Sequence, residues 1–194
     1  MMTQTFDRTK SEAFAERMLD ILNSGALAVM ISIGHRTELF DTIAELPSST
    51  SQEIADAAGL NERYVREWLG AMVTGRLVDY NAIDKTYTLP AEYAAFLTRA
   101  AAADNIAPFA QFIPVLASVE DRIIDCFYKG GGVPYSEFKR FHAVMAEDSG
   151  QTTVSALFDH ILPLIPGLTE ALQKGIEVLD VGCGSGRALN KLAA

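Results

Sequence analysis

The sequence predicts a mainly α-helical protein with an N-terminal helical and winged-helix domain, further helices, and the first strand of an α/β domain. Apolar residues recur at helical spacing through most of the chain. A helix-turn-helix pattern followed by a hairpin pattern occupies residues 38–89. An apolar segment, Ile176–Val181, then leads into three alternating glycines. We therefore expect domain boundaries that give the segments 1–98, 99–150 and 151–194.

Composition and charge restrict the class of protein. Hydrophobic residues make up 49% of the 194 residues, enough to bury a core, and the net charge of −9 argues against a nucleic-acid partner. The two cysteines, Cys126 and Cys183, lack metal-ligand spacing, so we expect a reduced, cytoplasmic protein without a metal site. The polar N-terminus is no signal peptide. The apolar run 25–33 is far shorter than the about 20 residues that span a membrane, so no membrane partner is expected.

Two helices are expected at the N-terminus. The first covers residues 10–23, with apolar and acidic side chains on opposite sides. Asn23, Ser24 and Gly25 interrupt the pattern, and an almost entirely apolar helix follows to Ile33. A helix that is apolar all round is buried on most faces. We therefore expect a homodimer packed through these helices, with burial inside one subunit as the alternative.

The winged helix is predicted from its caps and turns. A short helix over residues 38–46 precedes a second helix in which Thr50 and Glu53 fit a capping box. Gly59 suits the left-handed position at the end of that helix, and Asn61 can cap the next. Two helices joined by so short a turn, followed by a hairpin, form a winged helix.

A winged helix usually indicates a DNA-binding regulator, but the charge disfavours DNA here. Residues 35–98 carry five Lys or Arg and ten Asp or Glu, for a net charge of −5. Affinity for DNA depends largely on neutralising phosphates with a basic face. Nucleic acid is therefore not the expected partner.

Short helices are expected between the winged helix and the glycine-rich segment. They cover residues 100–103, 106–112, 118–128, 136–145, 154–164 and 168–174. Ser118 and Ser136 are the expected N-caps of two of them, and Gly130–Gly132 separates that pair.

The glycine-rich segment is the strongest functional signal. The segment Ile176–Val181 suits a buried parallel strand, and the glycines that follow allow a sharp turn and close approach of a ligand. The spacing is not that of the dinucleotide fingerprint, which disfavours nicotinamide and flavin. The predicted cofactor-binding residues are Asp180, Gly182, Gly184 and Gly186.

The nine residues VLDVGCGSG resemble motif I of the class I S-adenosylmethionine-dependent methyltransferases. The segments LNSGALAVMISIGHRTELFDTIAELP, AGLNERYVREWLGAMVTGRLV and GGGVPYSEFKRFHAVMAEDSGQ look like a bacterial family with an N-terminal winged helix and a Rossmann-like methyltransferase domain. This family is similar to small-molecule O-methyltransferases. The resemblance implies that Asp180 and the glycine loop hold the methionine end of S-adenosyl-L-methionine. It also implies that the N-terminal part forms a dimer and a lid over the substrate.

The chain departs from that family after Gly186, where only RALNKLAA follows. An acidic residue for the ribose hydroxyls is expected about 20 residues further on, and it has no counterpart here. The flanking strands are missing as well. The resemblance therefore implies an incomplete, Rossmann-like methyltransferase domain, poor support for the segment after Gly175, and a chain that is inactive alone.

Candidates for chemistry are few. Methyl transfer needs positioning and sometimes removal of a proton. His142 is a weak candidate for the base, with a structural or surface role as the favoured alternative. Tyr135, Phe138 and Phe141 could line a cofactor or substrate pocket, although aromatic residues at this spacing are more often core.

The remaining polar candidates are expected to be structural. They are His35, His160 and the loop residue Cys183, together with Glu147 and Asp148 as a solvated helix end. Two functions stay open. The first is the N-terminal portion of a methyltransferase that acts on a small molecule, and the second is a winged-helix regulator or dimerisation module without catalysis.

Overall fold

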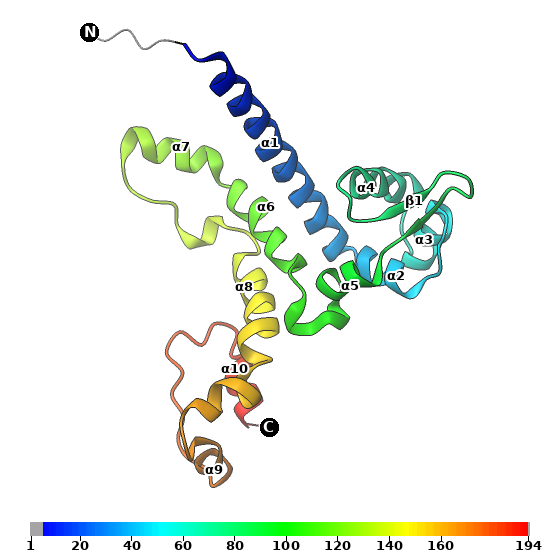
Figure 1. Ribbon diagram of the computed structural model, residues 1–194. Helices are drawn as coiled ribbons and strands as arrows, with labels where there is room; N and C mark the ends of the chain where they lie inside the picture. The colour runs from blue at the N-terminus through cyan, green and yellow to red at the C-terminus, as the bar shows by residue number, and fades with distance from the viewer. Residues whose placement is uncertain (1–5, 194) are drawn as a thin grey trace.

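The computed structural model describes residues 6–193 and is mainly helical, as predicted (Figure 1). The winged-helix body lies at the right-hand side of the molecule in Figure 1, at mid-height. A long N-terminal helix projects from it in one direction, and the C-terminal helices extend in the other. The N-terminal elements are α1 (Arg8–Arg36), α2 (Leu39–Glu45), α3 (Ser51–Ala58), α4 (Glu62–Thr74), β1 (Asp79–Asn81), β2 (Thr86–Thr88) and α5 (Ala91–Leu97).

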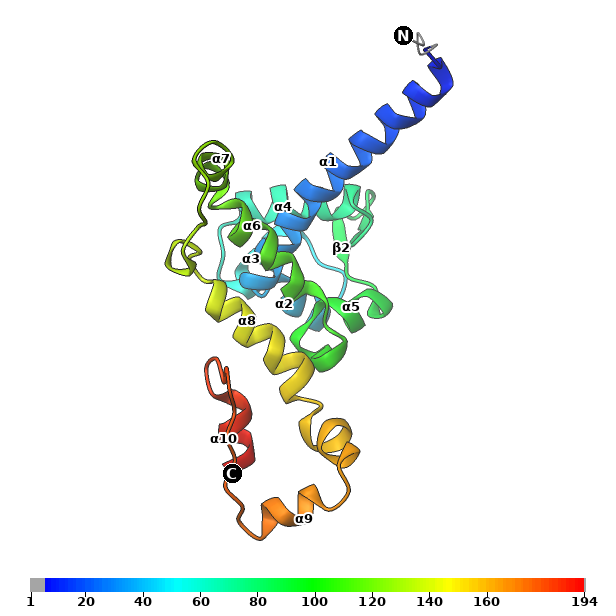
Figure 2. The ribbon, with the colours of Figure 1, turned by 90° about the vertical axis from the view of Figure 1, so that its left-hand side faces the viewer.

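Shorter helices follow the winged helix. They are η1 (Arg99–Asp104), η2 (Ala107–Gln111), α6 (Phe112–Ala117), α7 (Glu120–Lys129), η3 (Tyr135–Glu137), α8 (Phe141–Ser149), the π-helical turns η4 (Gly150–Val154) and η5 (Leu157–Ile161), η6 (Leu162–Leu164), α9 (Leu168–Gln173) and α10 (Arg187–Ala193). Figure 2 shows α8 between the winged-helix body and α10.

The core of the winged helix is built around Trp68 of α4. Its ring packs edge-on against Phe40 of α2, with 5.1 Å between ring centroids. The indole Nε1 donates a hydrogen bond of 2.8 Å to the carbonyl oxygen of Met30 in α1. Ile54, Leu69 and other apolar side chains complete the cluster. This core fixes the last turns of α1 on the winged helix.

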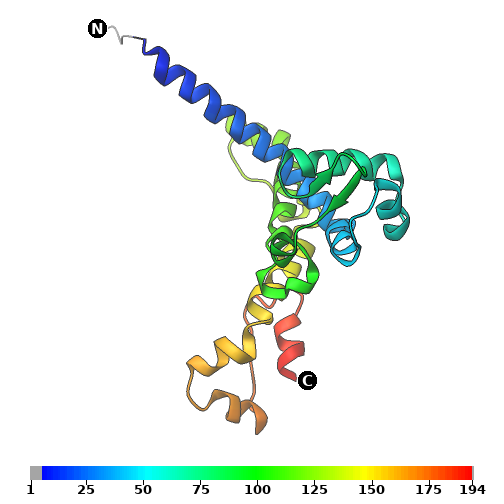
Figure 3. The ribbon, with the colours of Figure 1, turned by 45° about the vertical axis from the view of Figure 1, so that its right-hand side comes forward.

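The predicted caps and hairpin are confirmed. Thr50 and Glu53 form the capping box, and Gly59 ends α3 in the left-handed region with φ of 65°. The side chain of Asn61 accepts a hydrogen bond of 3.2 Å from the amide of Arg63. Strands β1 and β2 pair antiparallel, with Asp79 opposite Thr88, and form the wing in front of the helices in Figure 3.

The prediction of two N-terminal helices is wrong, because α1 is one continuous helix of 29 residues. Asn23, Ser24 and Gly25 lie inside it. A glycine in a helix costs only about 1 kcal/mol relative to alanine, and no proline is present to break the backbone hydrogen bonds. The packing of the last turns of α1 on Trp68 offsets that cost.

The apolar residues of α1 are not buried all round. Its first half projects into solvent (Figure 3), and Phe14, Leu19 and Leu22 are each at least 60% exposed. The shortness of the apolar run 25–33 therefore no longer argues against a membrane. By length and hydropathy α1 could cross one, a test that core helices of water-soluble proteins also pass.

Two predicted serine caps are wrong. Ser118 donates its hydroxyl hydrogen to the carbonyl oxygen of Val115, at 2.7 Å, and Val119 occupies the N-cap of α7 without a side-chain bond. Ser136 lies in the short 3-10 turn η3, and α8 begins only at Phe141, after Arg140 in the left-handed region with φ of 67°. The Ser118 hydroxyl thus bonds to a backbone carbonyl of the preceding turn instead of accepting from an amide of α7.

The predicted strand over Ile176–Val181 is not formed, since the described residues contain no strand beyond β1 and β2. Leu179 and Val181 are 87% and 88% exposed. A parallel strand needs a neighbour to satisfy its backbone groups, and no segment of the described chain pairs with this one. The expectation of poor support after Gly175 matches this arrangement.

Candidate functional site

An open cavity of about 880 Å³ lies between α8, η4 and the glycine loop that leads into α10. Asp180, Gly182 and Gly184 line it from the loop. Tyr135, Phe141, His142, Met145, Ala146 and Ser149 line it from α8 and the turn before it. Residues separated by about 40 positions in the sequence thus face one space.

The glycine loop turns at residues that require glycine. Gly182, Gly184 and Gly186 have φ of 83°, 55° and 71°, a region that other residues rarely adopt. No atom lies within 4 Å of the position that a Cβ would take at any of the three. At these three positions no side chain covers the backbone, so a ligand can approach it closely.

Two basic side chains of α10 fix the loop to α8 and η4. Arg187 Nη1 donates a hydrogen bond of 2.7 Å to the carbonyl oxygen of Ala146, and Lys191 Nζ donates one of 2.7 Å to that of Val154. A Cβ on Gly150 would lie 2.7 Å from Arg187 Nη1, so the small residue leaves room for the guanidinium. These bonds keep the glycine loop at the cavity without a sheet.

The aromatic side chains of the cavity also contact one another. The rings of Tyr135 and His142 are stacked, with centroids 6.3 Å apart and planes at 27°. Phe141 meets Tyr135 at 5.7 Å and Phe112 at 6.3 Å. Phe141 therefore both lines the cavity and packs towards the core, whereas Phe138 only packs against its aromatic neighbours.

The structure brings together most of the residues singled out in the sequence. Asp180, Gly182, Gly184 and His142 line the cavity, while Gly186 closes the turn through a hydrogen bond of 2.8 Å to the Cys183 carbonyl oxygen. Within residues 6–193, no group of three or more His, Cys, Asp or Glu side chains gathers as metal ligands do.

A partly buried polar network behind the cavity was missed in the sequence. His35 Nε2 lies 2.7 Å from Glu147 Oε1, and Gln111 Nε2 donates a hydrogen bond of 2.7 Å to Glu147 Oε2. The interpretation of Glu147 as a solvated helix end is therefore wrong. His35 and Glu147 are 112 positions apart, so no local pattern could reveal the pair.

The network changes the acidity of Glu147. Burial alone would raise the pKa of its carboxyl group, but the hydrogen bonds from Gln111 and His35 stabilise the carboxylate and lower the pKa below its ordinary value. The neighbouring Asp148 has no such partners, and burial raises the pKa of its carboxyl group. The pKa values of two adjacent carboxyl groups on α8 are thus shifted in opposite directions.

Comparison with known proteins gives one family model and several solved structures. Residues 25–99 match the Rv2258c-like winged HTH domain. A protein of Nostoc punctiforme described as an O-methyltransferase has 18% identity and a TM-score of 0.57 over 92% of this chain and 52% of its own. Mitomycin 7-O-methyltransferase MmcR has 20% identity and a TM-score of 0.58 over 95% and 56%. PigF with SAH has 17% identity and a TM-score of 0.52 over 97% and 55%.

The chain thus spans about half of the length of the solved structures that it matches. Comparison with the curated proteins gives no match. At these identities the likeness establishes the fold. Residues 25–99 thus carry a winged helix similar to the Rv2258c-like domain, and the chain shares the fold of about half the length of solved proteins described as O-methyltransferases.

Proposed function

We propose that this chain is the N-terminal portion of an S-adenosyl-L-methionine-dependent methyltransferase that acts on a small molecule. The observation that carries the proposal is the single cavity that Asp180, Gly182 and Gly184 share with Tyr135, Phe141 and His142. The fold likeness to an O-methyltransferase, and to a protein solved with SAH, supports it.

The residues present fit the methionine end of the cofactor. Gly182 and Gly184 expose bare backbone to the cavity, and the Asp180 carboxylate lies beside them, where it can accept hydrogen bonds from an ammonium group. When bound, the cofactor supplies an electrophilic methyl group on its sulfonium. The aromatic rings of Tyr135 and Phe141 line the other wall and offer apolar surface to the acceptor. His142, on the same wall, is the candidate to take up a proton from the acceptor.

We also propose that the chain alone binds the cofactor weakly and has no turnover. The apolar residues that lead into the loop are exposed, with Leu179 at 87% and Val181 at 88%, and they pair with no strand in the described part of the chain. A loop held only by Arg187 and Lys191 is less rigid than one that ends a sheet strand.

Replacing Asp180 with alanine is expected to weaken binding of SAH to the chain by about tenfold or more, because a charge-assisted hydrogen bond is lost. The measurement is an NMR titration with SAH that follows the amide signals of Gly182 and Gly184. Glu177→Ala is the matched control, because Glu177 is an exposed carboxylate three positions away that does not line the cavity. Equal affinities of the two variants would count against the site, and methyl transfer by the chain alone would contradict the proposed inactivity.

We further propose that the chain forms a homodimer through α1, and that nucleic acid and membranes are not its partners. The exposed half of α1 presents large apolar side chains, among them Phe14, Leu19 and Leu22. A solvent-exposed row of this kind marks a contact with another protein or with a membrane, and we propose a second copy of this chain as the occupant. The acidic winged helix, with a net charge of −5 over residues 35–98, offers no basic face for DNA.

Leu22→Glu is expected to raise the dissociation constant of the dimer by roughly 30-fold or more, because a charge would be buried in an apolar contact. Sedimentation velocity over a concentration series measures the change. Glu16→Gln on the same exposed half of α1 is the control and should leave the dimer intact. A monomeric wild-type chain, or wild-type protein that floats with lipid vesicles, would contradict the proposed dimer.

A further inference from the structure

The partly buried network behind the cavity connects the winged helix to α8. His35 is in the last turn of α1 and is 1% exposed, and its Nε2 meets one oxygen of Glu147 on α8 at 2.7 Å. Gln111 of η2 is also 1% exposed and donates to the other oxygen of Glu147. Both carboxylate oxygens are therefore occupied by groups from outside α8.

Gln111 holds α8 at both ends. Its amide nitrogen reaches Glu147, two residues before the end of the helix, and its Oε1 accepts a hydrogen bond of 2.5 Å from Arg140 Nη2, immediately before the helix begins. One buried side chain thus fixes the position of α8 along its axis and its rotation about that axis.

The two long faces of α8 have different surroundings. Val144, 1% exposed, and Glu147 lie on the face turned towards η2 and α6, and Glu147 reaches His35 of α1 from it. His142, Met145, Ala146 and Ser149 follow the helical spacing of three and four on the other face and line the cavity. Any rotation that loosens Glu147 therefore moves the wall of the cavity.

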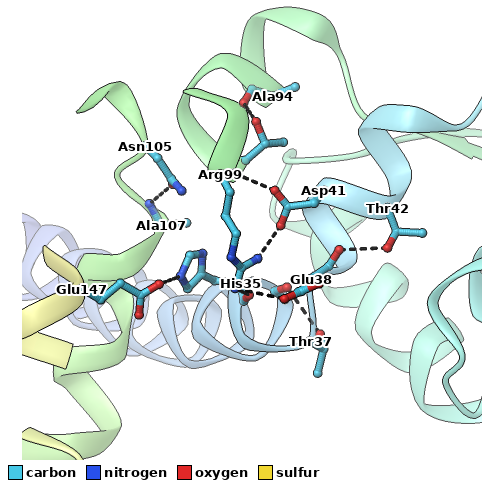
Figure 4. A network of polar contacts seen from close by, with 12 residues as sticks. His35, Thr37, Glu38, Asp41, Thr42, Ala94, Arg99, Asn105, Ala107 and Glu147 are labelled. Carbon is cyan, nitrogen blue, oxygen red and sulfur yellow. Dashed lines mark hydrogen bonds and ion pairs between the residues drawn. The ribbon is translucent and has the colours of Figure 1, made fainter. Parts of the chain in front are cut away.

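The other end of the network lies inside the winged helix (Figure 4). Arg99 Nη2 donates a hydrogen bond of 2.8 Å to the carbonyl oxygen of His35, and its Nη1 forms an ion pair of 2.5 Å with Asp41 of α2. One residue before His35, the position of a Cβ on Gly34 would be 2.4 Å from the ring of Trp68. The backbone of His35 is therefore set by the packing of the winged helix.

We infer that four residues act as positioning residues, namely His35, Gln111, Glu147 and Arg140. They couple the placement of α8, and with it the cavity wall, to the winged helix. None of them lines the cavity. The effect on cofactor binding rests on the proposed function, whereas the effect on α8 does not.

The first test is hydrogen exchange of the α8 amides in Glu147→Gln. A glutamine removes the charge that strengthens both bonds and offers only one acceptor oxygen. His35 must therefore lose its bond or move its proton to the buried Nδ1, which has no partner, and exchange should accelerate by roughly tenfold. The control is Asp148→Asn, which removes the same charge one position along, outside the network, and should change exchange by less than about twofold. Fluorescence of Trp68, the single tryptophan, checks that the winged helix is folded.

The second test is rescue. In the double variant Gln111→Glu with Glu147→Gln, the new carboxylate accepts from Arg140 and from the new amide, whose oxygen accepts from His35. Every hydrogen bond of the network is kept, with donor and acceptor exchanged between residues 111 and 147. Hydrogen exchange should therefore return to near the wild-type rate. Exchange in the double variant as fast as in Glu147→Gln, or an unfolded double variant, would overturn the inference, as would a Glu147→Gln rate equal to that of Asp148→Asn.

A third readout separates the inference from the proposed function. The dissociation constant of SAH should rise about fivefold or more in Glu147→Gln and return in the double variant. If SAH does not bind the wild-type chain, the proposed binding of the cofactor by this chain fails, and the exchange rates alone decide whether the network positions α8. If SAH binds all variants equally while exchange differs, the inference that the network acts on the cavity wall is wrong.

Discussion

Replacing Trp68 with alanine is expected to lower the free energy of unfolding by about 3–5 kcal/mol, the typical cost of a large cavity in a core. The side chain is 2% exposed and packs edge-on against Phe40. Its indole nitrogen also donates to the carbonyl oxygen of Met30, and the variant loses this additional hydrogen bond. Urea unfolding followed by far-ultraviolet circular dichroism measures the change, because the variant has no tryptophan to observe.

Tyr64→Ala is the matched control for this prediction. Tyr64 lies on the same helix, one turn before Trp68, and is 74% exposed. Its loss should cost less than about 1 kcal/mol, as for most surface substitutions. A Trp68→Ala variant as stable as Tyr64→Ala would mean that Trp68 is not the centre of the winged-helix core.

Gly34→Ala is expected to destabilise the protein by about 1–3 kcal/mol, although alanine is the better helix former. The added Cβ would lie 2.4 Å from Trp68 Cζ2 and 2.8 Å from Phe40 Cε2. Both rings are buried in the core and cannot swing away as an exposed side chain could. Either α1 or the rings must shift, and thermal or urea unfolding reports the loss.

The same substitution at Gly25, nine residues earlier on α1, should have the opposite sign. No atom lies within 4 Å of the position of a Cβ at Gly25, so alanine adds about 0.5–1 kcal/mol of helix propensity without a clash. This control also tests the continuity of α1. If the chain turned at Gly25, as the sequence suggested, alanine there would not stabilise the protein.

The winged helix was predictable because its signals are local. Thr50, Glu53, Gly59 and Asn61 each act within four residues of themselves, and short-range hydrogen bonds decide where those helices begin and end. The break at Gly25 was predicted from the same kind of local signal and was wrong, because the tertiary contacts of α1 with Trp68 outweigh a small cost in propensity.

The candidate site was predictable in part. The glycine loop and its aromatic neighbours were identified from the residues and from the resemblance, and the structure places them around one cavity. The network of His35, Gln111 and Glu147 was not, because its members are separated by up to 112 positions and come from three elements. A charged residue near a helix end is usually solvated, and only the packing shows this exception.

The unpaired segment Ile176–Val181 has a consequence for the behaviour of the protein in concentrated solution. Free backbone groups next to exposed Leu179 and Val181 form a template on which another chain can add a strand. At neutral pH the net charge of −9 keeps molecules apart. Near the isoelectric point of 4.8 that repulsion vanishes, so colloidal stability should be lost there well before the winged helix itself unfolds.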